Sequence, residues 1–70
     1  MKEQFLNVLI SSGVKDIYDT DTEAQTEFKK VKDAESMIKF VQYFGTKHVH
    51  AFTVRQVILG DFFNACIAIY

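Results

Sequence analysis

The sequence predicts a single α+β domain spanning residues 1–70, in which two helices pack on a small antiparallel β-sheet that ends in a C-terminal β-hairpin. Three observations lead to this expectation. The chain has 70 residues, which is enough for one domain only. Two segments, 2–12 and 34–44, carry apolar residues at helical spacing. The segment after residue 50 is rich in β-branched and aromatic residues and is interrupted by a glycine.

Residues 2–12 form the first expected helix. Phe5, Leu6, Leu9 and Ile10 are spaced so that they form one apolar stripe on a helix. Gly13 follows this stripe, and glycine readily adopts the left-handed conformation that ends many helices. We therefore expect the helix to end just before Gly13.

Residues 14–32 allow two interpretations. Thr22 and Gln25 have the spacing of a capping box, which predicts a helix that begins near residue 22. The alternative is a polar β-hairpin that would supply further strands to the sheet. Phe28 and Val31 would lie on opposite faces of such a strand, which argues against it but does not decide the matter.

The second expected helix covers residues 34–44. Charged and polar residues fill one side of a helical wheel, and five apolar residues fall on one broad arc of the other: Met37, Ile38, Phe40, Val41 and Phe44. Asp33 is a good N-cap for this helix. The glycine that follows Phe44 is expected to end it.

The C-terminal segment favours a hairpin with Gly60-Asp61 at its turn. Glycine at the first central position suits a type II′ turn, and a helix would have this glycine in its interior at a cost of about 1 kcal/mol. The alternative is an all-α fold in which residues 54–69 form a last helix. In the hairpin register, apolar residues lie on both faces of the two strands.

A sheet with two apolar faces needs a covering layer on each, and 70 residues supply too little chain for both. We therefore expect a small non-enzymatic protein-protein interaction module that self-associates as a homodimer or acts as a modulator or inhibitor of a larger protein. The expected partner-binding residues share the outer face of the hairpin: Arg55, Val57, Leu59, Phe62, Asn64 and Tyr70.

Charge argues against nucleic acid as a partner. Eight Lys and Arg against nine Asp and Glu give a net charge of −1, whereas nucleic-acid binders normally carry a basic excess. A helix-turn-helix regulator, starting at Thr53-Val54-Arg55-Gln56 in the all-α fold, is the first alternative function. Five acids without a base form a candidate acidic surface for a basic partner: Asp16, Asp19, Asp21, Glu23 and Glu27.

Metal binding through His48 and His50 is the second alternative, because a strand would place both rings on one face. Zinc needs at least three protein ligands, and no further ligand converges on this pair in the hairpin register, so no metal site is assigned. Cys66 lies among small apolar residues and is expected to pack in the core. No nucleophile–base pair and no glycine-rich phosphate loop is present, so we expect no catalytic residue and no cofactor.

The chain has neither a secretory signal pattern nor about 20 consecutive apolar residues, so no membrane association is expected. A lone cysteine is typical of a reducing compartment. The expected location is therefore the cytoplasm.

Overall fold

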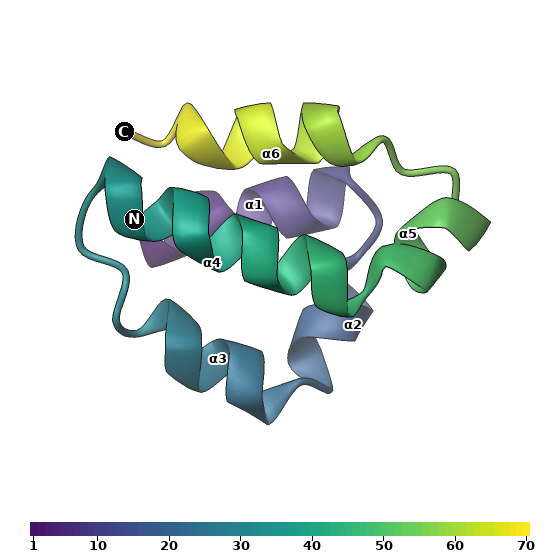
Figure 1. Ribbon diagram of the computed structural model, residues 1–70, viewed down its shortest axis with the longest axis horizontal. Coiled ribbons are helices and arrows are strands. Elements are labelled where there is room, and N and C mark those ends of the chain that lie inside the picture. Colours follow the sequence, from purple (N-terminus) through teal and green to yellow (C-terminus); the bar gives the residue numbers. More distant parts are fainter.

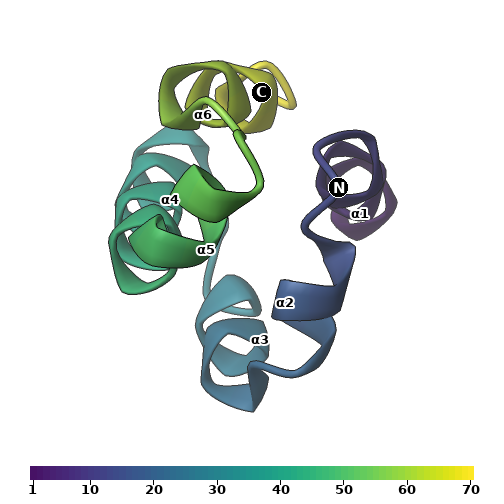
Figure 2. The same cartoon turned by 90° about the vertical axis from the view of Figure 1, so that its right-hand side faces the viewer.

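The computed structural model describes all 70 residues and is entirely helical (Figure 1). The expected α+β class is therefore wrong, and the all-α alternative holds. Helix α6 packs against both α4 and α1, which lie on opposite sides of the molecule in Figure 2. Helices α2 and α3 lie below them in Figure 1, and α5 lies at one end. The helix bounds are α1 (Lys2–Ser11), α2 (Lys15–Asp19), α3 (Thr22–Phe28), α4 (Ala34–Lys47), α5 (Val49–Val54) and α6 (Leu59–Ile67).

Helix α1 ends as the sequence predicts. Gly13 has φ +73°, and its N–H donates to the Ile10 carbonyl at 3.0 Å. The Val14 N–H donates to the Leu9 carbonyl, also at 3.0 Å. These two bonds form a Schellman motif, and the side chains of Leu9 and Val14 are both fully buried beneath it.

The segment 14–32, left open by the sequence, forms two short helices and no strand. The N-cap of α3 is Asp21 rather than Thr22, and its carboxylate accepts from the Ala24 N–H at 3.0 Å. Gln25 then ties α3 to α2, because its side-chain amide donates to the carbonyls of Tyr18 and Asp19. The sequence indicated the helix start to within one residue but not its true cap.

Helix α4 begins where expected and ends three residues later than expected. Asp33 and Ser36 form a reciprocal capping box at its start. Gly45 does not end the helix but lies inside it, buried against α6. A side chain at this position would meet Leu59 at 3.2 Å, so the glycine allows α6 to pack closely on α4.

The expected hairpin is wrong: of its first strand, residues 52–54 belong to α5 and residues 55–58 connect α5 to α6, and its turn residues Gly60-Asp61 lie in the first turn of α6. The chain reverses earlier, at Gln56, which has φ +58°. The cost of about 1 kcal/mol for glycine in a helix is smaller than the roughly 1.5–3 kcal/mol gained by burying one phenylalanine side chain. Phe62 and Cys66, four residues apart, then share the buried face of α6.

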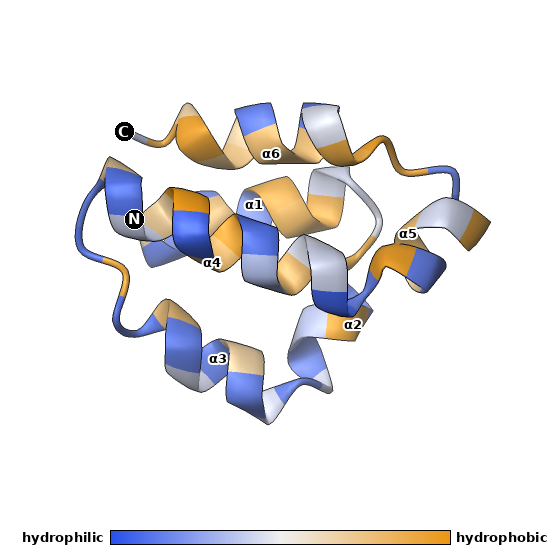
Figure 3. Ribbon diagram, in the orientation of Figure 1, coloured by the Kyte–Doolittle hydropathy of each residue, from blue (hydrophilic) through white to orange (hydrophobic).

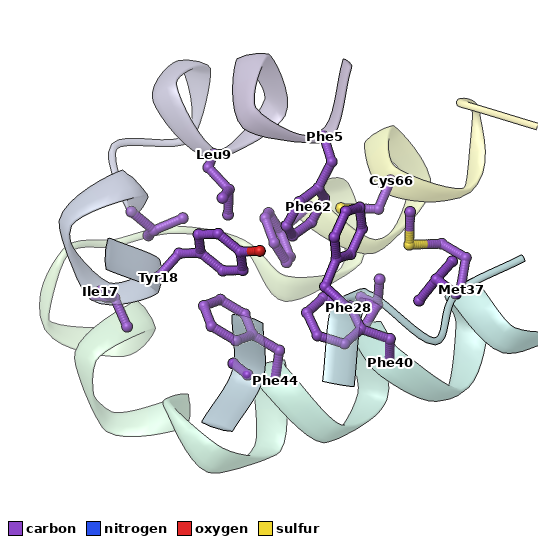
Figure 4. Close-up of a cluster of buried hydrophobic side chains, with 14 of the residues drawn as sticks. Phe5, Leu9, Ile17, Tyr18, Phe28, Met37, Phe40, Phe44, Phe62 and Cys66 are labelled. Carbon is purple, nitrogen blue, oxygen red and sulfur yellow. The ribbon is translucent and has the colours of Figure 1, made fainter. Parts of the chain in front are cut away.

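Seven aromatic rings dominate the core (Figure 4). Phe5 stacks on Phe28 with ring centroids 4.3 Å apart, and Phe44 lies 6.0 Å from Phe52 and 6.2 Å from Phe62. The accessible surface of the chain is 4393 Å². A monomeric globular protein of this mass is expected to expose roughly 4500 Å². The helical fold therefore covers its own core, which the hairpin would not have done.

None of the six helices combines the length and the apolar composition needed to cross a bilayer.

Two substitutions at residues with a left-handed backbone conformation, Gln56 and Gly13, test the turns, and we expect them to change the stability in opposite directions. Replacing Gln56 with glycine should raise the free energy of unfolding by about 0.5–1 kcal/mol, because glycine adopts this conformation without the steric cost of a Cβ. Replacing Gly13 with alanine should lower it by a similar amount. Urea denaturation followed by circular dichroism measures both. Destabilisation by Gln56→Gly would show that the turn depends on the glutamine side chain.

Candidate functional site

The predicted partner-binding residues do not share a surface in the structure, because the hairpin face that grouped them is absent. Phe62 is 2% exposed and belongs to the core, so it is not available to a partner. Val57 is half-buried and packs against the core. Asn64 and Tyr70 are exposed on α6 and at the C-terminus, and Leu59 is exposed at the start of α6.

Exposed apolar side chains instead gather around the connection between α5 and α6. Val54, Ile58 and Leu59 are 67%, 65% and 37% exposed. Figure 3 shows the connection as hydrophilic where it leaves α5 and strongly hydrophobic where it approaches α6. We name these three residues the α5–α6 apolar surface. Scattered exposed apolar residues are normal, but three within six positions of a short connection are a candidate contact site.

A shallow groove of about 110 Å³ continues this surface between α4 and α6. Leu59 belongs to both, and Phe63 lies beside it on α6. The opposite wall comes from α4, where Gly45 lets the side chain of Leu59 lie close to the helix. Its lining contains no charged residue: Val41, Gln42, Gly45, Thr46, Leu59 and Phe63.

Hydrogen bonds hold the backbone of the connection in place. The backbone N–H of Gln56 donates to the Thr53 carbonyl at 3.0 Å, and the N–H of Val57 donates to the Phe52 carbonyl at 2.9 Å. This is a second Schellman motif, built on a glutamine where glycine is usual. A non-glycine residue in this conformation is a point of local strain, and such points are enriched at functional sites.

Arg55 fixes the same connection to the turn after α1. Its guanidinium donates to both carboxylate oxygens of Asp16, at 2.6 and 2.8 Å, and to the Gly13 carbonyl at 3.0 Å. The hydrogen bond from Arg55 holds the pKa of Asp16 at about 2, well below its usual range. Arg55 was predicted to bind a partner, but in the structure its guanidinium joins two turns of its own chain.

Lysine and arginine residues of the same chain neutralise most of the predicted acidic surface. Besides the pair with Arg55, Asp19 pairs with Lys15 at 2.9 Å and Glu27 with Lys30 at 3.2 Å. Asp21 and Glu23 share Lys47, at 3.0 and 3.2 Å. All five acids therefore have a cation of this chain beside them, which leaves little unpaired negative charge to attract a basic partner.

Asp21 is the one buried carboxylate, with 8% of the residue exposed. Burial opposes its ionisation, but hydrogen bonds from His48, the Ala24 N–H and Lys47 outweigh this and lower its pKa to about 2. The His48 Nε2 lies 2.7 Å from the Asp21 carboxylate. The network ties the start of α3 to the end of α4.

The two histidines do not form a pair. His48 lies at the junction of α4 and α5 and faces Asp21, whereas His50 is exposed on α5. A helix turns about 200° over two residues, so the shared face expected for a strand is lost. No group of three or more potential ligands for a metal ion comes together in the structure.

Cys66 is fully buried in the core, as its apolar neighbours in the sequence predict. Burial raises the pKa of its thiol to about 12, so very little thiolate forms near neutral pH. The expected packing role is confirmed, and reactive chemistry at this position is disfavoured.

Sequence reasoning missed Val54 and Ile58, the most exposed members of the apolar surface. The hairpin register placed both on the strand face that was to cover the core. A helical reading of 49–54 separates Val54 from the buried Phe52 by about 200°, which would have placed its side chain outward. A search of this chain against protein-family models, curated proteins and solved structures found no match.

Proposed function

We propose that the protein is a non-enzymatic interaction module that binds another protein chain through the α5–α6 apolar surface. The observation that carries this proposal is the exposure of Val54, Ile58 and Leu59 on a connection whose backbone is held by hydrogen bonds. A fixed apolar surface loses little conformational entropy when it is covered, which favours binding.

A second copy of the chain is the proposed occupant. In a twofold contact each patch meets itself, so a charged patch would set like charges against one another. The groove beside Leu59 has no charged lining residue, and the chain carries a net charge of only −1. Pairing of two such faces therefore meets little electrostatic repulsion.

The alternative functions gain no support from the site. A helix-turn-helix reader needs cationic residues on the helix that enters the groove, and α6 contains Asp61 but no Lys or Arg. His48 is engaged by Asp21, which leaves His50 as a lone ligand for a metal. No specific observation favours either alternative.

Light scattering across protein concentration tests the proposal. The wild-type mass should rise from that of one chain toward that of two, and Ile58→Asp should weaken association at least about tenfold, since it would bury a charge without a partner. Thr26→Asp on α3 is the control: it also adds one negative charge, at an exposed site away from α5 and α6. A wild-type mass of one chain up to millimolar concentration, or equal loss in both variants, would refute the proposal.

A further inference from the structure

We infer that a cleft between α1, α2 and α3 binds a small organic anion of the phosphate-monoester class. The cleft has a volume of about 490 Å³ and is the largest of three hollows on the molecule. This volume lies within the range of small-molecule sites, roughly 300–1,000 Å³. The cleft lies on other elements than the α5–α6 apolar surface, so the inference is independent of the proposed function.

The cleft concentrates positive charge on a chain whose net charge is −1. Its three lysines come from different elements: Lys2 begins α1, Lys15 begins α2, and Lys29 directly follows α3. The one carboxylate in the lining, Asp19, accepts from Lys15 with both oxygens at 2.9 Å. That pair is neutral, so the remaining charge of the cleft is carried by Lys2 and Lys29.

Lys2 and Lys29 have no partner within the protein. Seven ion pairs form, and neither of these lysines takes part in one. Two unpaired ammonium groups match the charge of a phosphate monoester, which is close to −2 near neutral pH. Near these lysines in sequence, Asp16 is held by Arg55 and Glu27 by Lys30. Glu3 forms no ion pair, but it is not part of the lining of the cleft.

The rest of the lining suits the organic part of such a ligand. Leu6 and Tyr18 contribute apolar surface to the cleft. Gln25 holds two lining residues of the cleft in place, because its side-chain amide donates to the Tyr18 carbonyl at 2.8 Å and to the Asp19 carbonyl at 3.1 Å. A compact aromatic or aliphatic group beside the phosphate would cover this apolar wall and exclude water from the charged contact.

Titration of ¹⁵N-labelled protein with phenyl phosphate at low ionic strength tests the inference by nuclear magnetic resonance. We expect saturable shifts confined to the amides of the cleft, among them Lys2, Tyr18 and Lys29. The double variant Lys2→Gln/Lys29→Gln should raise the dissociation constant at least about tenfold. The matched double variant Lys32→Gln/Lys39→Gln removes the same charge outside the cleft, leaves the pair of Lys30 with Glu27 intact, and should bind as the wild type does.

Three outcomes would overturn the inference. Equal weakening in both double variants would show general attraction to lysines. Equal shifts with uncharged benzyl alcohol would show apolar adsorption alone. Equal affinity for inorganic phosphate would show that Leu6 and Tyr18 do not contribute to binding. Circular dichroism of both double variants, which change only exposed side chains, establishes that any loss of binding is not a loss of fold.

Discussion

Replacement of Phe44 by alanine should leave the protein largely unfolded at 25 °C. Phe44 is fully buried, and its ring lies against aromatic rings from three other helices: Tyr18 of α2, Phe52 of α5 and Phe62 of α6. Truncating a buried phenylalanine costs about 3–5 kcal/mol. A core of this size rarely supplies more than about 3–5 kcal/mol in total, so the loss removes most or all of the stability.

Phe63 provides the matched control for this change. It is also a phenylalanine on a helix of the same core, but it is only partly buried, beside the groove between α4 and α6. Phe63→Ala should cost less than half as much as Phe44→Ala and leave a cooperative urea transition by far-UV circular dichroism. Equal destabilisation by the two changes would contradict the central position of Phe44.

The two helices with a strong apolar period and local end signals were predictable from the sequence. Segment 2–12 has its stripe and Gly13, and the start of α4 has Asp33 with its cap. Both signals act over a few residues and are readable without knowledge of the rest of the chain. The end of α4 was misplaced because it depends on a partner helix: Gly45 packs against Leu59 of α6, and this contact has no local sequence signal.

The C-terminal segment was misassigned because its apolar residues fit two periods at once. Phe62 and Cys66 are four residues apart, which places them on one face of a strand as well as one face of a helix. The β-branched composition and Gly60 then favoured the hairpin locally. Tertiary packing decides otherwise, because α6 buries both residues against the aromatic core.

The candidate site was only partly predictable because its main determinants join residues distant in sequence. Leu59 was identified, although on a strand face that does not exist. The pairing of Asp16 with Arg55 spans 39 positions, and that of Asp21 with His48 spans 27. Neither pair has a local sequence signal. The five acids within residues 16–27 were therefore interpreted as a free acidic surface.

Replacement of Asp21 by alanine should lower the free energy of unfolding by about 2–3 kcal/mol. The change removes the N-cap of α3, worth about 1 kcal/mol, and leaves Lys47 and the half-buried His48 without their shared carboxylate. Asp19→Ala is the control, since it breaks a surface pair with Lys15 that is worth at most about 0.5 kcal/mol. Urea denaturation at neutral pH measures both, and a loss at Asp21 no larger than at Asp19 would contradict a structural role for the network.

The dependence of stability on pH separates the contribution of the charge of Asp21 from that of the shape of its side chain. Its pKa is about 2 in the folded protein against an ordinary value of 3.8, so ionised Asp21 favours the folded state. This stabilisation is complete above pH 4 and disappears as the pH falls from about 4 to 2. The wild type should therefore exceed Asp21→Asn in stability at pH 6, and the gap should close over that acidic range, because both proteins then carry a neutral side chain. A gap that stays constant down to pH 2 would show that the carboxylate acts through its shape and hydrogen bonds alone.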